Sequence, residues 1–125
     1  MPEPSVLRWI NKQPPARLFT TTITQGEVLY GIRVLADGRR RSRLWDAARQ
    51  IFAEDFAGQV LSFDADAADM YAEIASSRRS AGRPISQFDA MIAAIARSRG
   101  ASLATRNTKD FFDCGIEVID PWAGE

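Results

Sequence analysis

Helix-like and strand-like stretches alternate along this chain, and this alternation constrains the fold more than any single motif does. Apolar residues recur at helical spacing in the longer stretches, and short β-rich segments lie between them. Because the connections between the strands carry helices, we expect the strands to run parallel. The pattern predicts an α/β/α layered domain with a short parallel sheet.

Residues that begin and end helices give the expected boundaries. Ser86 is a helix-capping residue, and Gly100 and Pro121 end the segments before them. No linker or repeat interrupts the pattern, so residues 1–125 are expected to form one domain. Helices are expected over residues 5–11, 24–35, 42–56, 65–80 and 86–99, and strands over residues 17–22, 59–63, 103–105 and 117–119.

Charge and hydropathy give little support for a nucleic-acid partner and none for a membrane. The 16 basic residues balance 16 acidic ones. A basic cluster at residues 39–43 is interpreted as the solvated start of a helix, with contact to RNA phosphates as the alternative. No apolar run approaches the roughly 20 residues that span a membrane, and no secretory signal is evident. The cluster consists of Arg39, Arg40, Arg41 and Arg43.

The sequence contains no histidine and one cysteine, which excludes several kinds of catalysis. Ser-His-Asp and Cys-His mechanisms and histidine-rich zinc sites need an imidazole. Cys114 has no partner for an internal disulfide, and this indicates a reducing cytoplasm. We expect Cys114 to be a small buried residue without catalytic chemistry.

Acidic and amide side chains follow the predicted strands, where the next helices or turns begin. The carboxyl ends of parallel strands face one edge of a sheet, so these side chains are expected to converge. Oxygen ligands without histidine suit Mg²⁺ or Mn²⁺ rather than zinc, and such a site would orient and polarise a phosphodiester. A metal-dependent nuclease is therefore one hypothesis. The candidate residues are Glu27, Asp89, Asn107 and Asp110.

Helix capping is the other explanation of these residues. Thr24 and Glu27 have the spacing of a capping box, and Ser86 and Asp89 repeat it with aspartate. Acids in a first helical turn also favour the positive end of the helix dipole. The polar residues after the strand 103–105 suit a turn.

Several stretches of the sequence resemble the PIN-domain family, in its VapC and FitB subgroup. Residues 22–32 resemble the family segment around its second acidic residue, and residues 86–96 resemble the segment around the third. Residues 103–111 resemble the segment after the next strand, and residues 118–122 resemble the last strand and tail. The stretches occur in family order and cover essentially the whole chain.

The resemblance implies the toxin of a type II toxin–antitoxin pair. Such a protein is an endoribonuclease dependent on Mg²⁺ or Mn²⁺, commonly a homodimer, and inhibited by a small antitoxin that itself binds operator DNA. By position Glu27 and Asp89 match the second and third acids and Asn107 the fourth, so these are the expected metal ligands. Asp110 is a nearby acid grouped with the catalytic residues. Two threonines fall near polar positions that hold water or metal: Thr22 and Thr105.

One part of the family pattern is not found. The family's first strand is central in the sheet and carries Asp-Thr-Asn with a metal-binding aspartate, and this sequence has no Asp-Thr-Asn. Without that strand its neighbours would leave a gap or close up in a shifted register. Three explanations stay open: a start assigned to an internal Met of a longer protein, a decayed and inactive toxin, or a fragment that folds and binds a partner without cutting. The alternative function is therefore an inactive PIN remnant that binds the antitoxin or dimerises.

Overall fold

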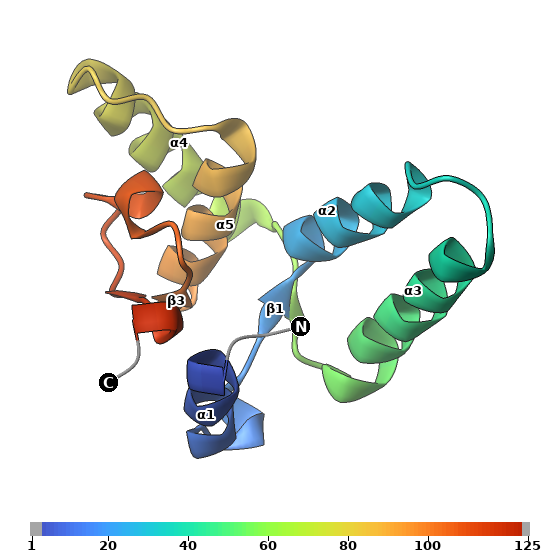
Figure 1. Ribbon diagram of the computed structural model, residues 1–125. Coiled ribbons are helices and arrows are strands. Elements are labelled where there is room, and N and C mark those ends of the chain that lie inside the picture. The colour runs from blue at the N-terminus through green and yellow to red at the C-terminus, as the bar shows by residue number, and fades with distance from the viewer. Residues whose placement is uncertain (1–3, 124–125) are drawn as a thin grey trace.

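The computed structural model describes residues 4–123 and has the α/β architecture that the sequence predicts (Figure 1). Over these residues, no helix is long and apolar enough to cross a membrane. The α-helices are α1 (Pro4–Lys12), α2 (Thr22–Arg33), α3 (Arg39–Gln50), α4 (Ala65–Ser80) and α5 (Gln87–Ser98). The strands are β1 (Thr20–Thr21), β2 (Val60–Leu61), β3 (Leu103–Ala104) and β4 (Val118–Ile119). Shorter helical turns are η1 (Pro15–Arg17), η2 (Ile51–Asp55), η3 (Thr108–Phe111) and η4 (Pro121–Ala123).

The strands form two parallel pairs, which confirms the expected direction. In the β1–β2 pair Thr20 lies opposite Val60, and in the β3–β4 pair Leu103 lies opposite Val118. Within residues 4–123 no ladder joins the two pairs, so they are separate two-stranded sheets. Of the two expected outcomes for the flanking strands, residues 4–123 show the gap and not a closed-up sheet in a shifted register.

Helices α4 and α5 pack against each other and supply most of the core. Ala94 and Ile95 of α5 are 0% exposed, and Ile74 of α4 is 2% exposed. The short alanine side chains leave room for the facing helix, so the larger isoleucines fill the interior. Phe111 and Cys114 close this core from the C-terminal segment, and the predicted burial of Cys114 is confirmed.

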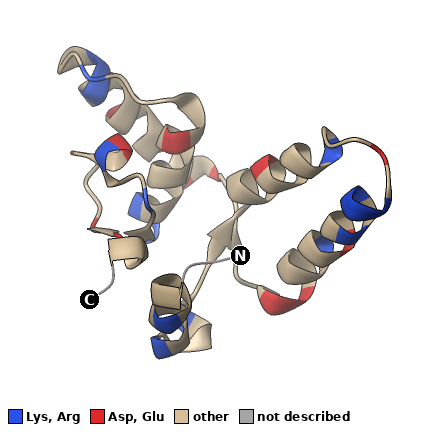
Figure 2. Cartoon of the chain, in the orientation of Figure 1, with Lys and Arg blue, Asp and Glu red and all other residues tan. Residues whose placement is uncertain are grey.

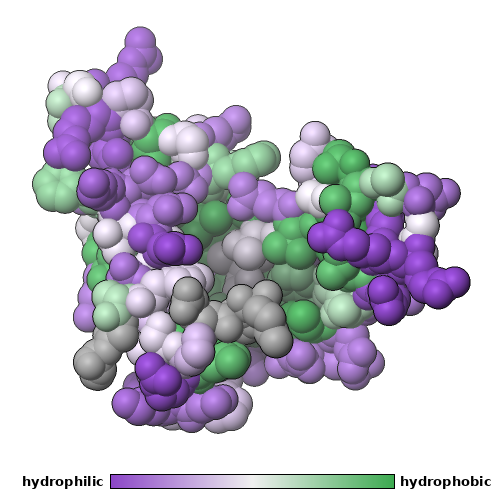
Figure 3. Space-filling model, in the orientation of Figure 1, coloured by the Kyte–Doolittle hydropathy of each residue, from purple (hydrophilic) through white to green (hydrophobic). Residues whose placement is uncertain are grey.

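Helices α2 and α3 form a hairpin that projects from the rest of the molecule (Figure 1). The guanidinium of Arg33 in α2 lies 4.9 Å from the ring centroid of Trp45 in α3, which links the two helices. No residue of α2 is buried in the described structure, and Tyr30 and Val34 are 70% and 63% exposed. Figure 3 shows apolar side chains gathered on this hairpin beside strongly hydrophilic ones. The hairpin therefore presents apolar surface to solvent.

The arginine cluster begins α3, as expected for a solvated helix start (Figure 2). Gly38 precedes the helix and offers no capping side chain. Arg41 is paired with Asp37 at 4.0 Å. Because a helix N-terminus carries a partial positive charge, arginine is electrostatically unfavourable in this first turn.

Local hydrogen bonding explains where the expected boundaries differ from the observed ones. Helix α2 begins at Thr22 rather than at residue 24, because the Thr21 side chain accepts the backbone N–H of Thr24 and caps the helix. Helix α3 begins before residue 42 and changes at Ile51 to the π-helical turn η2. The expected strands shorten to two residues each, and in the range 17–22 residue 17 belongs to η1 and residue 22 to α2.

Candidate functional site

Glu27 lies on the exposed surface of α2, past its first turn. The expected capping box between Thr24 and Glu27 is wrong, because Thr21 is the capping residue and its Oγ1 lies 3.0 Å from the Thr24 amide nitrogen. Within residues 4–123 no hydrogen bond or ion pair engages the Glu27 carboxylate. Capping therefore does not explain why a carboxylate stands at this position.

Asp89 lies in the first turn of α5, where the sequence predicts it. Ser86 caps this helix, and its Oγ accepts the Asp89 backbone N–H at 3.2 Å, which confirms the predicted cap. The cap uses the amide of Asp89 and leaves its half-buried carboxylate without a partner among the described residues.

Asn107 and Asp110 lie in the turn that follows β3. The Thr105 hydroxyl accepts the Asn107 backbone N–H at 3.1 Å, and the Asn107 carbonyl accepts the Asp110 N–H at 3.1 Å. Both the Asn107 amide and the Asp110 carboxylate are exposed. The hydrogen bonds fix the backbone of the turn and leave these two side chains available for a ligand.

The three segments that carry the candidate residues are connected through α5. This helix contacts both α2 and η3, so the elements that carry Glu27 and Asp110 each touch the helix that carries Asp89 (Figure 1). Among residues 4–123, however, no three His, Cys, Asp or Glu side chains form a group that could hold a metal ion. The structure therefore does not assemble a complete metal centre from these acids, and their assignment as ligands stays a prediction.

The chemistry of the available donors fits a hard divalent cation. Glu27 and Asp89 offer free carboxylates and Asn107 an amide oxygen. Mg²⁺ keeps several of its waters and is commonly held by one or two carboxylates together with substrate phosphates. A partial oxygen shell of this kind is compatible with Mg²⁺ or Mn²⁺. Zinc is less well suited, because the chain has no histidine side chain to bind it.

Asp64, by contrast, has a structural task. It follows β2, and its side chain accepts the Ala67 backbone N–H at 3.0 Å to cap α4. It also pairs with Arg99 at 3.2 Å. The hydrogen bond from Ala67, together with the bond and charge of Arg99, lowers the pKa of the Asp64 carboxyl. Asp64 therefore stabilises the fold through these contacts, whereas the carboxylates of Glu27 and Asp89 make no such contacts among the described residues.

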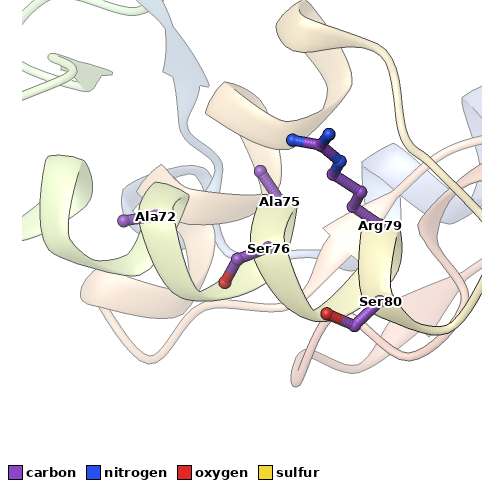
Figure 4. Close-up of a pocket in the computed structure, with 5 residues that line it drawn as sticks. All are labelled: Ala72, Ala75, Ser76, Arg79 and Ser80. Atoms are coloured by element: carbon purple, nitrogen blue, oxygen red, sulfur yellow. The ribbon is translucent and has the colours of Figure 1, made fainter.

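A surface pocket is lined by residues of α4 alone (Figure 4). None of Glu27, Asp89, Asn107 and Asp110 lines it, and its walls offer no carboxylate. We therefore do not place the candidate site there. Its lining consists of Ala72, Ala75, Ser76, Arg79 and Ser80.

Sequence reasoning missed Arg78, which is 6% exposed and is the one buried charged residue in the described structure. Its guanidinium donates to the Asp110 carbonyl at 3.0 Å and so touches the candidate turn. The spacing of Ala67, Ile74 and Arg78 would have revealed it, because residues 67, 74 and 78 share one face of α4.

Comparison with known proteins identifies the family. The model of the PIN domain family matches residues 3–114. The plasmid stability protein StbB of Pseudomonas syringae pv. tomato is 39% identical over 121 residues, which are 97% of this chain and 87% of that protein. A VapC ribonuclease of Sinorhizobium fredii is 34% identical over 121 residues, again 97% of this chain and 86% of that protein.

The fold comparison agrees. The structure of FitAB bound to a DNA fragment superimposes with a TM-score of 0.91 and 31% sequence identity, covering 100% of this chain and 89% of that one. The resemblance in the acidic segments, the parallel strand pairs and these matches all point the same way. This chain belongs to the PIN-domain family, in its group of VapC and FitB proteins.

Proposed function

We propose that this chain is the toxin of a type II toxin–antitoxin system and an endoribonuclease that cleaves RNA phosphodiester bonds with Mg²⁺ or Mn²⁺. Its relatives support the toxin assignment, since they include a VapC ribonuclease and the FitAB complex. One observation carries the nuclease assignment. The half-buried carboxylate of Asp89 stands at the positive end of α5 and takes no part in capping that helix.

The residues have distinct roles in this proposal. Glu27, Asp89 and Asn107 hold the divalent metal, and Asp110 acts beside them as a further catalytic acid. A divalent metal held by these residues would orient the phosphodiester, polarise its oxygen and supply the hydroxide needed for in-line attack. Thr105 fixes the Asn107 backbone, so that the amide side chain starts from a defined position.

The proposed partners follow from the same assignment. A small antitoxin protein binds and inhibits the chain, operator DNA is reached through that antitoxin, and RNA is the substrate. The exposed apolar surface of the α2–α3 hairpin suits a protein partner or a second copy of the chain, since such patches mark interaction sites. We propose a cytoplasmic homodimer without a membrane partner.

A cleavage assay with Asp89→Asn tests the function. We expect RNA cleavage by the wild-type protein only with Mg²⁺ or Mn²⁺, stopped by EDTA, and lowered by at least about 100-fold in the variant. Asp66→Asn is the matched control, because Asp66 also lies in the first turn of a helix and is exposed. Equal cleavage by Asp89→Asn and wild type would refute the assigned role of Asp89.

The alternative is an inactive PIN remnant that binds the antitoxin or dimerises. It is favoured by the two separate sheets and by the lack of a three-acid group among residues 4–123. This function predicts no metal-dependent cleavage but saturable binding to the small protein encoded beside it. Measuring cleavage and binding on one preparation separates the two functions.

A further inference from the structure

Arg78 near the end of α4 is buried, and among residues 4–123 it has no acidic partner. Its side chain is 6% exposed, and the acceptors of its guanidinium are backbone carbonyls and one thiol. A buried cation is costly unless it is well hydrogen-bonded, and a neutral carbonyl compensates less than a carboxylate. The position therefore demands a specific explanation.

The guanidinium joins two segments that are far apart in the sequence. Its Nε donates to the Arg83 carbonyl at 2.7 Å, in the loop between α4 and α5. Its Nη1 donates to the carbonyls of Asp110 at 3.0 Å and Phe112 at 2.9 Å, in and after η3. One side chain thus fixes the loop that leads into the helix of Asp89 and also the turn that carries Asp110.

Arg83 makes two further contacts that join the same segments, one with Arg78 and one with Phe112. The Arg83 backbone N–H donates to the Arg78 carbonyl at 2.9 Å, which ends α4 with Gly82 in the left-handed region at φ 75°. The Arg83 guanidinium lies 4.7 Å from the ring centroid of Phe112. Arg78, Arg83 and Phe112 therefore contact one another in all three pairs.

We propose that Arg78 is a positioning residue: it sets the turn of Asp110 relative to the start of α5 and thereby the spacing of Asp110 and Asp89. This inference rests on the proposed metal-dependent function of those two acids. The proposal gives Arg78 no contact with the substrate or the metal. It acts through backbone carbonyls, so its contribution is geometric.

The geometry requires arginine rather than any cation. The planar guanidinium presents donors in fixed directions from two different nitrogens, and here it uses both Nε and Nη1. A lysine ammonium at the same place is one centre at the end of a flexible chain and cannot hold both segments in the same arrangement. Arg78→Lys therefore tests positioning separately from charge.

Three variants test the proposal in the full chain. Arg78→Lys keeps the charge, Arg78→Met keeps the length of the side chain, and Arg79→Met is the control, because Arg79 is the next residue of α4 and is exposed. Amide hydrogen exchange measures the opening of residues 82–83 and 108–112. Binding of Mn²⁺, followed by electron paramagnetic resonance, measures the effect on the proposed ligands Asp89, in α5, and Asn107, in the turn of Asp110. The reaction rate of Cys114 with a thiol reagent reports release of the segment beside Arg78, whose Nη1 lies 3.5 Å from Sγ.

We expect both Arg78 variants to exchange at least about 10-fold faster in both segments and to bind Mn²⁺ about 10-fold more weakly, while Arg79→Met behaves as wild type. Wild-type levels of exchange and Mn²⁺ affinity in a folded Arg78→Lys protein would overturn the proposal. If Arg78→Met fails to fold, the measurements on Arg78→Lys and on the wild-type protein test the proposal. In the wild type, segments 82–83 and 108–112 must open together, and independent opening overturns the link. A wild-type protein that binds no Mn²⁺ refutes the metal function, while the exchange data still decide whether Arg78 positions the two segments.

Discussion

Replacing Ile74 by alanine removes a side chain from the centre of the α4–α5 core. Ile74 is 2% exposed, and it packs in the cluster that also contains Ile95 and Phe111. Truncation of a buried isoleucine to alanine costs about 2–5 kcal/mol, from lost burial and from the cavity left behind. A domain of this size unfolds with about 5–15 kcal/mol, so the variant loses a large share of its stability. The melting temperature should fall by roughly 8–20 °C, at about 4 °C for each kcal/mol.

Urea unfolding followed by far-ultraviolet circular dichroism measures this loss. Ile51→Ala is the matched control, because the chemical change is the same and Ile51 is 40% exposed in η2. We expect the control to change the free energy of unfolding by no more than about 0.5 kcal/mol. A loss below about 1 kcal/mol in Ile74→Ala, or equal losses in both variants, would show that the α4–α5 core does not carry the stability.

Three further predictions concern charge and pH. Arg40→Glu should raise the free energy of unfolding by about 0.5–1 kcal/mol, because it places an acid at the start of α3. Arg49→Glu in the last turn of α3 should lower it. The urea midpoints of the two variants should therefore shift in opposite directions from wild type. Asp64→Ala should lower the free energy of unfolding at neutral pH, because the folded-state pKa of Asp64 is lowered and its contribution is lost on protonation. The difference in this free energy from wild type should shrink as the pH falls below 3.8. A difference that is constant from about pH 6 to about pH 3 would contradict this. Burial raises the pKa of the Cys114 thiol above its ordinary 9.0. The rate of alkylation of the folded protein should therefore stay slow at about pH 8, rise only beyond pH 9.0, and become fast on unfolding in urea. Fast alkylation of the folded protein at about pH 8 would refute this prediction.

Periodicity and capping residues were sufficient to predict the helical framework. The expected helix over residues 65–80 has the observed bounds of α4, and the Ser86 cap of α5 is confirmed. Strand lengths were overestimated, because an isolated β-rich stretch does not reveal how many of its residues find a ladder partner. The parallel direction was predictable, since it follows from the helical connections.

The sequence yields candidate residues for the site, but the geometry of the site could not be predicted from it. Glu27 was assigned to a capping box that the structure does not form, because the earlier Thr21 caps α2 instead. Two possible caps three residues apart cannot be ranked from the sequence, as each has a suitable side chain. Whether the acids converge depends on how helices that are distant in the sequence pack, and short-range patterns carry no information about this.

The two-residue strands have a consequence for how the molecule moves. The β1–β2 pair is closed by few backbone bonds, among them Thr20 N–H to the Gln59 carbonyl at 3.0 Å, and it leads directly into the exposed hairpin. Segments with little buried surface open at low free energy, whereas the fully buried centre of α5 opens only when the whole domain unfolds. The hairpin should therefore open locally, as one unit, more often than α5 does. A partner could then change the conformation of the hairpin without unfolding the helices that carry Asp89 and Arg78.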